Sequence, residues 1–334
     1  MLDTTNPLTY PSLAPSHRHA AVELFDDWAG GLLPVGGMRT LGIYLNRSPR
    51  PARDLSSYVE STGSRLFRSL QPRQWLDLLY GDRLSSSFAY GIALGLAYDV
   101  QERGAIEASA IQNEIKVGVT LGGPARLLDL SLGLQRVGLT DGTLEQTGGS
   151  GLLAEARGRW RIDERTTVTP VAAIELTAYG LSPETRERTR VKAGVAMSVR
   201  PTPSVLAIAG ILVEADETGR TPTPGAPNLT DRVRVLPALI AGGEVGVGSM
   251  VFRLGISHRN LLVDRDVLLR DGSPINNRSS DTDMDVSVGL GFVFGDLLLD
   301  GVIEKDFLRD GPHLIGGSRH GGGILSTLSL TYQL

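Results

Sequence analysis

Large and small side chains alternate along residues 88–100, with a repeat at every second residue. A period of two predicts a β-strand, because successive side chains of a strand point to opposite faces. Aromatic residues near both ends of the large face, with aliphatic residues between them, are typical of a strand that crosses a hydrocarbon layer. The pattern is more than twice as long as an average globular strand of about 5 to 6 residues. The large residues are Phe88, Tyr90, Ile92, Leu94, Leu96, Tyr98 and Val100.

The same alternation returns in segments 128–135, 152–162, 190–200 and 283–294. Arg157, Arg159 and Arg161 share one face of their segment, and three guanidinium groups on one face need water or partners. Alternation alone fits both a soluble β-sandwich and a barrel in lipid. A soluble β protein therefore stays open as the alternative fold until strand length and turn spacing are considered.

Tight turns and longer loops alternate from residue 81 onward. The tight turns are predicted near 81–84, 122–125, 163–165, 201–203, 246–249 and 295–296. The longer loops are predicted near 101–107, 140–149, 181–188, 217–230, 261–280 and 308–319. Long strands joined in this way are typical of an outer-membrane barrel, with the tight turns on the periplasmic side.

The spacing predicts an all-β fold, a closed antiparallel transmembrane β-barrel of about 14 strands. More than half of the chain would then be strand, and closure would pair the backbone of every strand. An even strand number returns the C-terminus to the side of the tight turns. The predicted spanning segments are 37–46, 73–80, 86–100, 108–121, 126–139, 150–162, 166–180, 189–200, 204–215, 231–245, 249–260, 281–294, 297–307 and 321–334.

Composition narrows the remaining classes of protein. The chain has 334 residues, 41% hydrophobic residues and a formal net charge of −4, which exclude intrinsic disorder. The absence of cysteine excludes disulfides, thiolate nucleophiles and cysteine-ligated zinc. Weak acidity argues against a nucleic-acid partner. The first residues show no signal peptide, so we expect one to have been removed from a protein of the Gram-negative outer membrane.

The last eleven residues, 324–334, resemble the terminal strand by which bacterial outer-membrane barrels are recognised for insertion. Leu328, Leu330, Tyr332 and Leu334 lie on one face of this segment. Leu334 departs from the usual pattern, in which the final residue is aromatic. The segment therefore agrees with outer-membrane lipid as a partner.

Residues 1–36 stand outside the predicted strands and contain Asn6-Pro7, Pro11 and Pro15. A fourteen-stranded barrel preceded by such a segment resembles the fatty-acid transporter (FadL-like) architecture, and the shuttle proteins of type IX secretion are similar. The resemblance implies an N-terminal hatch over 1–36 that plugs a barrel over 37–334. Residues 47–72 are expected to form an extracellular loop with a short helix that begins at Asp54. The hatch candidates are Asn6, Pro7, His17 and His19.

Catalytic and metal chemistry have little support in the sequence. The five histidines lie in no recognisable catalytic signature. His17 and His19 are two residues apart and share a face, but no carboxylate cluster accompanies them. The run 321–323 lacks the lysine of a phosphate-binding loop. We therefore expect no enzyme activity, no cofactor and no metal.

Charged residues that alternate with apolar ones are the candidates for the lumen. Basic residues come from the middle strands and acidic residues from the late strands, so opposing walls could carry opposite charge and orient a polar solute; they could also simply pair with one another. The candidates are Arg157, Arg159, Arg161, Arg190, Lys192, Arg234, Asp283, Asp285, Asp300, Glu304 and Asp306.

Two prolines fall inside alternating segments, Pro170 and Pro237. Proline has no N–H to donate to a neighbouring strand, so each site predicts a bulge, a kink or a gap in the wall. A gap would let an apolar molecule leave sideways into the membrane.

These patterns predict an outer-membrane channel or transporter. It would take up a small apolar or amphipathic molecule passively, gated by the N-terminal hatch. The alternative is a scaffold that conducts nothing, whose barrel anchors a protein partner at its extracellular loops. Neither the ligand nor the partner can be named from the sequence.

Overall fold

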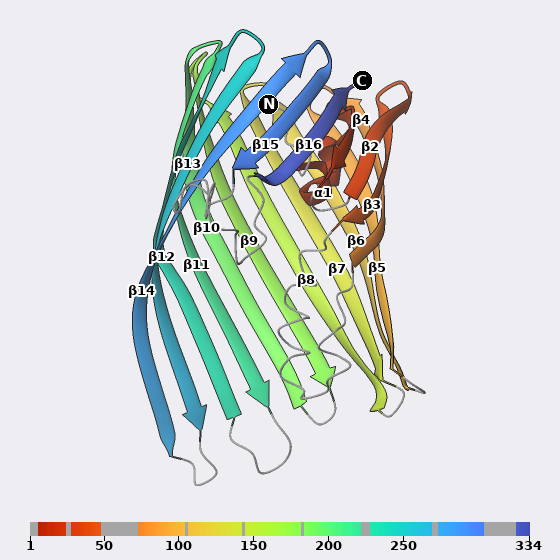
Figure 1. Ribbon diagram of the computed structural model, residues 1–334, viewed down its shortest axis with the longest axis vertical. Helices are drawn as coiled ribbons and strands as arrows, with labels where there is room; N and C mark the ends of the chain where they lie inside the picture. The colour runs from red at the N-terminus through yellow and green to blue at the C-terminus, as the bar shows by residue number, and fades with distance from the viewer. Residues whose placement is uncertain are drawn as a thin grey trace, which may run out of the picture.

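The computed structural model describes residues 6–24, 28–47, 73–103, 106–141, 144–181, 184–221, 228–268, 273–303 and 325–334. These residues form one closed antiparallel barrel of sixteen strands (Figure 1). Two short helical elements precede the barrel, α1 (Asn6–Thr9) and the 3-10 helix η1 (Pro11–Ser16).

The first eight strands are β1 (His19–Glu23), β2 (Trp28–Gly36), β3 (Arg39–Arg47), β4 (Arg73–Ser85), β5 (Phe88–Arg103), β6 (Ile106–Gly123), β7 (Arg126–Asp141) and β8 (Leu144–Arg161). The last eight are β9 (Thr166–Leu181), β10 (Glu184–Thr202), β11 (Val205–Thr221), β12 (Asn228–Val247), β13 (Met250–Leu268), β14 (Pro274–Phe294), β15 (Leu297–Ile303) and β16 (Leu325–Gln333).

The alternation in the sequence separates the two faces of the wall, and β5 shows it clearly. Leu94 lies on the outer face and is 41% exposed, whereas Ala93 beside it lies on the inner face and is 9% exposed. Large apolar residues thus face outward and small or polar residues face inward, the reverse of a water-soluble barrel with an apolar core. The all-β closed antiparallel fold that the sequence predicts is confirmed.

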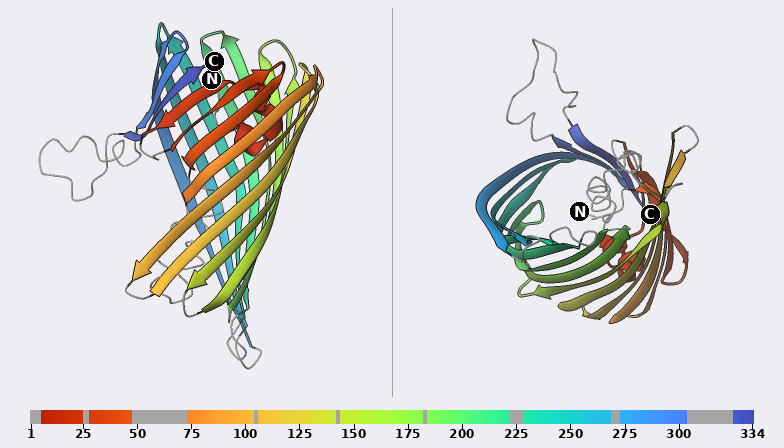
Figure 2. Two further views of the ribbon diagram at one scale, coloured as in Figure 1. Left: turned by 90° about the vertical axis from the view of Figure 1, so that its right-hand side faces the viewer. Right: turned by 90° about the horizontal axis from the view of Figure 1, so that it is seen from below.

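The barrel closes between the first and the last strand. β1 pairs with β16, with His19 opposite Gln333, and also pairs with β2 on its other edge. Every strand therefore has two neighbours, which satisfies the backbone groups of the wall. The C-terminus lies beside the start of the wall, where the N–H of Leu334 donates to the carbonyl of Arg18 at 3.2 Å, and β1 and β16 share one end of the barrel (Figure 2).

The prediction of fourteen strands is wrong, because two further strands lie within residues 1–36. The fourteen predicted segments correspond to β3 to β16, while β1 and β2 complete the wall before them. Both escape detection in the sequence because β1 has only five residues and β2 contains Gly30-Gly31 and Pro34. The wall therefore begins at His19 instead of residue 37, and the architecture is not the fourteen-stranded FadL-like one.

Tight turns follow β2, β4, β6, β8, β10, β12 and β14, and they gather at the end of the barrel that also holds the chain ends (Figures 1 and 2). Gly248 and Gly295 take φ angles of +62° and +61° in two of these turns. L-residues with side chains rarely adopt such angles, so glycine makes these short connections possible. The predicted tight turns are found, but the predicted alternation with longer loops is not regular, because only two residues separate β5 from β6, β7 from β8 and β9 from β10.

Within the described residues, the predicted long loops are mostly strand, and the predicted loop 308–319 lies outside those residues. Of the predicted loop 261–280, residues up to Leu268 belong to β13 and residues from Pro274 belong to β14. Residues 274–280 are mostly polar, and the apolar residues of 261–268 do not occur at every second position, so neither stretch gives a regular apolar alternation to recognise. The predicted loop over residues 47–72 lies outside the described residues, apart from Arg47 at the end of β3.

The wall differs in height around its circumference. β8 and β10 to β14 have 17 to 21 residues, whereas β1 has 5 and β15 has 7. A strand needs about 9 to 11 residues to cross the hydrocarbon layer. The long strands therefore continue well past such a layer, away from the tight turns (Figure 1).

Candidate functional site in the barrel lumen

Residues Asn6–Ser16, which we call the inner segment, lie against the inner face of the wall near the tight turns (Figure 1). The segment contacts β4, β5 and β6, and residues 11–15 are all buried. Its own backbone is held by bonds from the N–H of Tyr10 to the carbonyl of Asn6 and from the N–H of Leu13 to the carbonyl of Tyr10. Prolines at 7, 11 and 15 suit such a short helical segment, since they pre-set φ.

Three glycines form the surface on which this segment lies. Gly81, Gly91 and Gly118 sit opposite one another on β4, β5 and β6. A methyl group on Gly81 would come within 2.8 Å of Pro15 Cδ, and one on Gly118 within 2.9 Å of Pro11 Cδ. At Gly91 it would overlap the carbonyl of Pro11 and lie 2.7 Å from the nitrogen of Ser12. We call this row the glycine seat, because any larger residue would push the segment off the wall.

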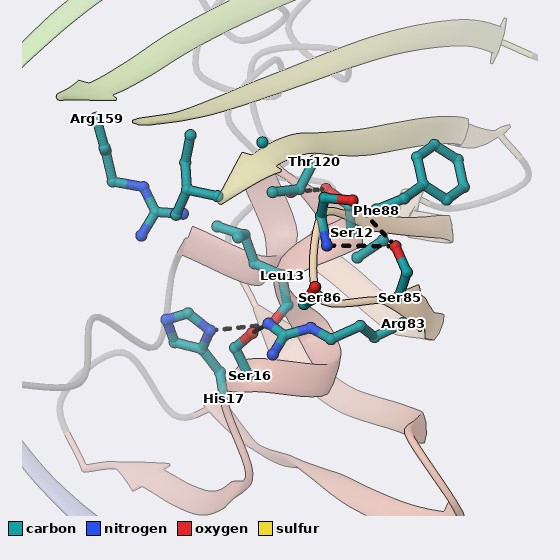
Figure 3. A pocket seen from close by; sticks show the side chains of 14 residues that line it. Ser12, Leu13, Ser16, His17, Arg83, Ser85, Ser86, Phe88, Thr120 and Arg159 are labelled. Atoms are coloured by element: carbon teal, nitrogen blue, oxygen red, sulfur yellow. Dashed lines mark hydrogen bonds between the residues drawn. The ribbon is translucent and has the colours of Figure 1, made fainter. Parts of the chain in front are cut away.

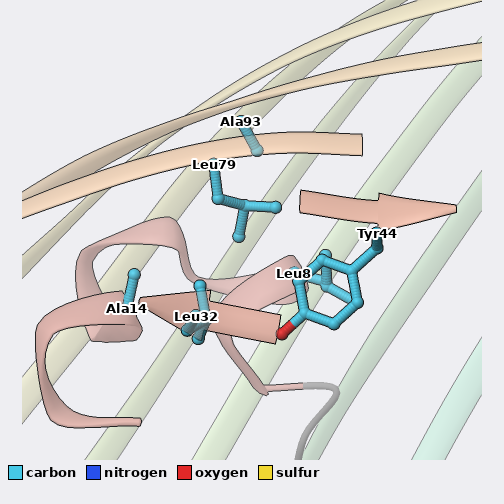
Figure 4. Packing of buried hydrophobic residues seen from close by; sticks show 6 residues of the cluster. All are labelled: Leu8, Ala14, Leu32, Tyr44, Leu79 and Ala93. Atoms are coloured by element: carbon cyan, nitrogen blue, oxygen red, sulfur yellow. The ribbon is translucent and has the colours of Figure 1, made fainter. Parts of the chain in front are cut away.

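An apolar cluster packs next to the glycine seat (Figure 4). Leu8 and Ala14 of the segment pack with residues of β2, β3, β4 and β5. Tyr44 is fully buried at its centre, and its hydroxyl lies 3.0 Å from Nε2 of His19. The wall residues of the cluster are Leu32, Tyr44, Leu79 and Ala93.

Polar groups of the wall hold the segment from β6, β7 and β8. Arg157 donates to Asn6 Oδ1 at 2.6 Å and to Asp129 Oδ2 at 2.9 Å, and its guanidinium lies 4.7 Å from the ring centre of Tyr10. Asp129 is completely buried and also accepts a 2.8 Å bond from the Thr120 hydroxyl.

Two further bonds reach the segment from β6. Thr120 shares a 2.8 Å bond with the hydroxyl of Ser12, and Lys116 donates to the carbonyl of Leu8 at 3.2 Å. We call Arg157, Asp129, Thr120 and Lys116 the latch. A planar guanidinium can bridge a carboxylate and an amide oxygen in this way because its five N–H groups point in fixed directions.

The remaining lumen candidates mostly lie in ion pairs between neighbouring strands. Arg190 and Lys192 of β10 contact Glu214 of β11 at 2.6 Å and 3.4 Å. Asp300 of β15 pairs with Arg253 of β13. Positive and negative charges are thus mixed along each of these parts of the wall. In the described part of the wall, these charges pair with charges on neighbouring strands. They do not form the two oppositely charged walls that the sequence suggested.

Other lumen candidates are placed as follows. Arg159 contacts Asp129 at 3.3 Å, and Arg161 is exposed at the end of β8. Asp283 and Asp285 stand opposite Arg259 and Ser257 on β13, on the inner face. Glu304 and Asp306 lie outside the described residues.

Arg234 faces away from the lumen, contrary to the prediction. It stands opposite Ala215, whose other neighbour Val191 is an exposed residue of the outer face. The register of β12 shifts between Val235 and Ala238, so the residues before the shift change face. Arg234 lies 4.0 Å from Asp264 instead of lining the lumen.

Both prolines of the wall lie at interruptions of the ladder. Pro237 falls within the shift in β12. Pro170 stays in register with Val195 of β10, but on the other side the pairing between β8 and β9 passes from Arg157 with Val171 to Trp160 with Val168. Both positions are bulges in the described wall, with paired strands on either side.

The hatch candidates separate into two places. Asn6 and Pro7 belong to the inner segment, and Nδ1 of His17 lies 3.0 Å from the carbonyl of Leu13 just after it. His19 is instead the first residue of β1 and is buried in the wall. No group of three metal-ligating side chains occurs among the described residues.

Several residues of this site escape sequence reasoning. Asp129 is the one carboxylate in the leucine-rich stretch 127–134, which is the signal that could have identified it. Gly81, Gly91 and Gly118 are far apart in the sequence, and only the pairing register brings them together.

A small hollow lies between the end of the inner segment and the wall (Figure 3). It has about 460 Å³ of empty volume, part of it open to solvent. Its lining includes Ser16 and His17 from the chain, Arg83 from β4 and Arg159 from β8. The hollow therefore lies between the segment and the tight-turn end of the barrel.

No helix within the described ranges is long and apolar enough to cross a membrane. No family model matches this sequence, and no curated protein matches it.

Solved structures of similar shape come from larger proteins. The ferric citrate transporter FecA in its unliganded form has a TM-score of 0.49 at 9% identity, over 85% of this chain and 44% of that one. The siderophore receptor PiuA from Acinetobacter baumannii has a TM-score of 0.48 at 8% identity, over 85% and 48%. The ferric-catecholate import receptor Fiu from E. coli K12 in its closed form has 0.47 at 9%, over 94% and 54%. The chain spans about half the length of these proteins, and no conclusion about its own ligand follows from them.

Proposed function

We propose that this chain lies in the outer membrane of a Gram-negative bacterium and conducts a small apolar or amphipathic molecule without chemical change. The inner segment is the gate in this proposal. The observation that carries it is the glycine seat, where three neighbouring strands omit their side chains under the segment. A wall that only had to close on itself would not need this gap at the same level on each strand.

The outer face supports the membrane location. On β10, Val191, Val195 and Met197 are exposed large apolar residues, and the next outward positions toward the far end are Thr189 and Glu187. The apolar stretch from Val191 to Val199 matches the roughly 9 to 11 residues that a tilted strand needs to cross lipid. Exposed apolar residues arranged in this way around a barrel favour contact with acyl chains.

The latch explains how the gate stays closed. Hydrogen bonds from charged donors contribute about 1.5 to 3 kcal/mol each, and both Arg157 and Lys116 make one to the segment. The conformation with the inner segment on the glycine seat is therefore favoured. A ligand would open the gate by binding more tightly to the conformation in which the segment has left the seat.

Conductance in planar bilayers tests this function. Deleting residues 1–16 removes the inner segment but keeps every wall strand, so the open-pore conductance should rise. Gly91→Ala should give a smaller rise, because its methyl group overlaps the backbone at Pro11 and Ser12. Gly289→Ala is the matched control, since its nearest contacts would be 3.4 Å away. If both the deletion and Gly91→Ala conduct as the unaltered protein does while remaining folded, the segment is no gate.

The height of the wall favours a second function, a scaffold that holds a protein partner. Beyond the apolar band, Arg232 contacts Glu217 at 2.9 Å and Asp266 at 2.6 Å, and Arg278 contacts Asp264. Such alternating charges on an outward surface suit the polar rim of a protein interface. A closed conductance after deletion of residues 1–16 would favour this scaffold over transport.

A further inference from the structure

The hollow of Figure 3 is basic and rich in hydroxyl groups. Arg83 and Arg159 approach it from different strands, and Ser16, Ser85, Ser86 and Ser87 add hydroxyls. None of the described side chains that line it is a carboxylate. Guanidinium and hydroxyl groups are donors that bind oxyanions in proteins.

The positive charge of Arg83 is not balanced nearby. Its guanidinium donates to the hydroxyl of Ser16, and no described carboxylate lies within ion-pair distance. The adjacent Asp82 is a buried partner of Arg39 instead, at 3.3 Å. A cation held partly out of water without a counter-ion attracts an anion.

Arg159 is only partly balanced. It lies 3.3 Å from Asp129, but that carboxylate already accepts two bonds from Arg157 and one from Thr120. Its Nη2 donates to Asp129 Oδ1 at 3.4 Å, whereas its buried Nε, the atom 3.3 Å from Asp129 Oδ2, makes no hydrogen bond. One carboxylate therefore serves two guanidinium groups, and one positive charge remains at the edge of the hollow.

We propose that this hollow binds a phosphate group, supplied by free phosphate or by the head group of a phospholipid. Arg83 and Arg159 would bind its oxygens from the wall, and Ser16 and the serines of the β4–β5 turn would donate from their hydroxyls. Because Ser16 and His17 belong to the segment side and the arginines to the wall, the bound group joins the two. Phosphate thus strengthens the seating of the inner segment. The proposal does not depend on transport.

Calorimetric titration of inorganic phosphate into the full chain in a phosphate-free maltoside detergent tests the site. We expect saturable binding to the unaltered protein and at least a tenfold weaker Kd for Arg83→Gln. Arg165→Gln is the matched control, because Arg165 is an exposed arginine of a tight turn outside the hollow. Heat-modifiable migration on gels confirms that each variant is folded. Equal affinity for Arg83→Gln and the unaltered protein would overturn the site.

Short-chain lipids distinguish the source of the phosphate group. Competition by dihexanoyl phosphatidic acid at lower concentration than inorganic phosphate indicates a lipid head group, and the reverse order indicates free phosphate. Dihexanoylglycerol, which lacks the phosphate, should not compete, and competition by it would overturn phosphate recognition. Amide hydrogen exchange gives a readout beyond affinity: saturating phosphate should slow exchange at residues 12–17. Unchanged exchange at saturation would overturn the joining of segment and wall.

Discussion

Asp129 is the counter-ion of two arginines at the site. It is completely buried and lies next to both Arg157 and Arg159. Asp129→Ala leaves two guanidinium groups without their counter-ion, so we expect a loss of about 3 to 5 kcal/mol in the free energy of unfolding. Urea unfolding in lipid vesicles measures it.

A double variant separates the lost charge from the lost packing at this position. Asp129→Ala combined with Arg157→Ala removes both partners, and the double variant should be less destabilised than the sum of the two single losses. Strict additivity would show that the two side chains do not act as a pair.

Asp163 is the residue whose protonation we expect to affect a tight turn. Its carboxylate accepts backbone bonds from Arg165 at 2.7 Å and Thr166 at 2.8 Å. The bond from Arg165 first, and then the bond to Thr166, hold the pKa of Asp163 below its ordinary value. A lowered folded-state pKa means that the stabilisation is present above the unfolded pKa and is lost as pH falls through the folded one.

The Asp163→Asn variant checks this pH dependence. It should be less stable than the unaltered protein at pH 7, and the difference should shrink as pH falls below about 4. Unfolding midpoints measured across that range give the comparison. A difference that stays constant down to pH 2 would mean that the carboxylate charge does not stabilise the turn.

Among the elements, β5 offers the clearest test of which face meets lipid. Leu94 lies on the outer face of this strand, in the middle of its apolar stretch. Leu94→Arg should cost about 2 to 4 kcal/mol of folding free energy in a bilayer. Leu94→Ile is the control for shape, and it should change stability far less. Normal folding of Leu94→Arg in lipid vesicles would place this face outside the membrane.

The sequence predicts elements well where lipid imposes a pattern, and poorly elsewhere. All fourteen predicted segments are strands, because apolar alternation marks the part of each strand that faces lipid. β2 is hidden by glycines and Pro34, and the halves of β13 and β14 away from the tight turns show no regular apolar alternation. Arg234 changes face because of a bulge that the residue types do not reveal.

The candidate site was predictable only in part, for a related reason. Asn6, Pro7 and Arg157 could be selected from the residues, since proline and clustered arginine are visible in any single segment. Their association with Asp129 and with the glycine seat depends on which residues stand opposite each other across strands. Cross-strand register follows from the whole barrel, and no local pattern contains it.

At the scale of the whole molecule, two deletions test where the inner segment ends and the wall begins. Deleting residues 1–16 should leave a folded barrel, because β1 begins at His19. Deleting residues 1–36 also removes β1 and β2, which leaves one edge of β3 and one edge of β16 unpaired, and this chain should fail to fold. Heat-modifiable migration on gels distinguishes the two, and a folded product from the longer deletion would mean that β1 and β2 are dispensable.

The pairing of β1 with β16 also sets the order in which this protein can be assembled. The seam of the cylinder joins the first strand to the sixteenth, so the sheet cannot shut until β16 has been synthesised. Until then both terminal strands present bare backbone edges, which readily pair with other chains. A chain that stops before β16 would therefore be a substrate for proteases instead of a smaller pore.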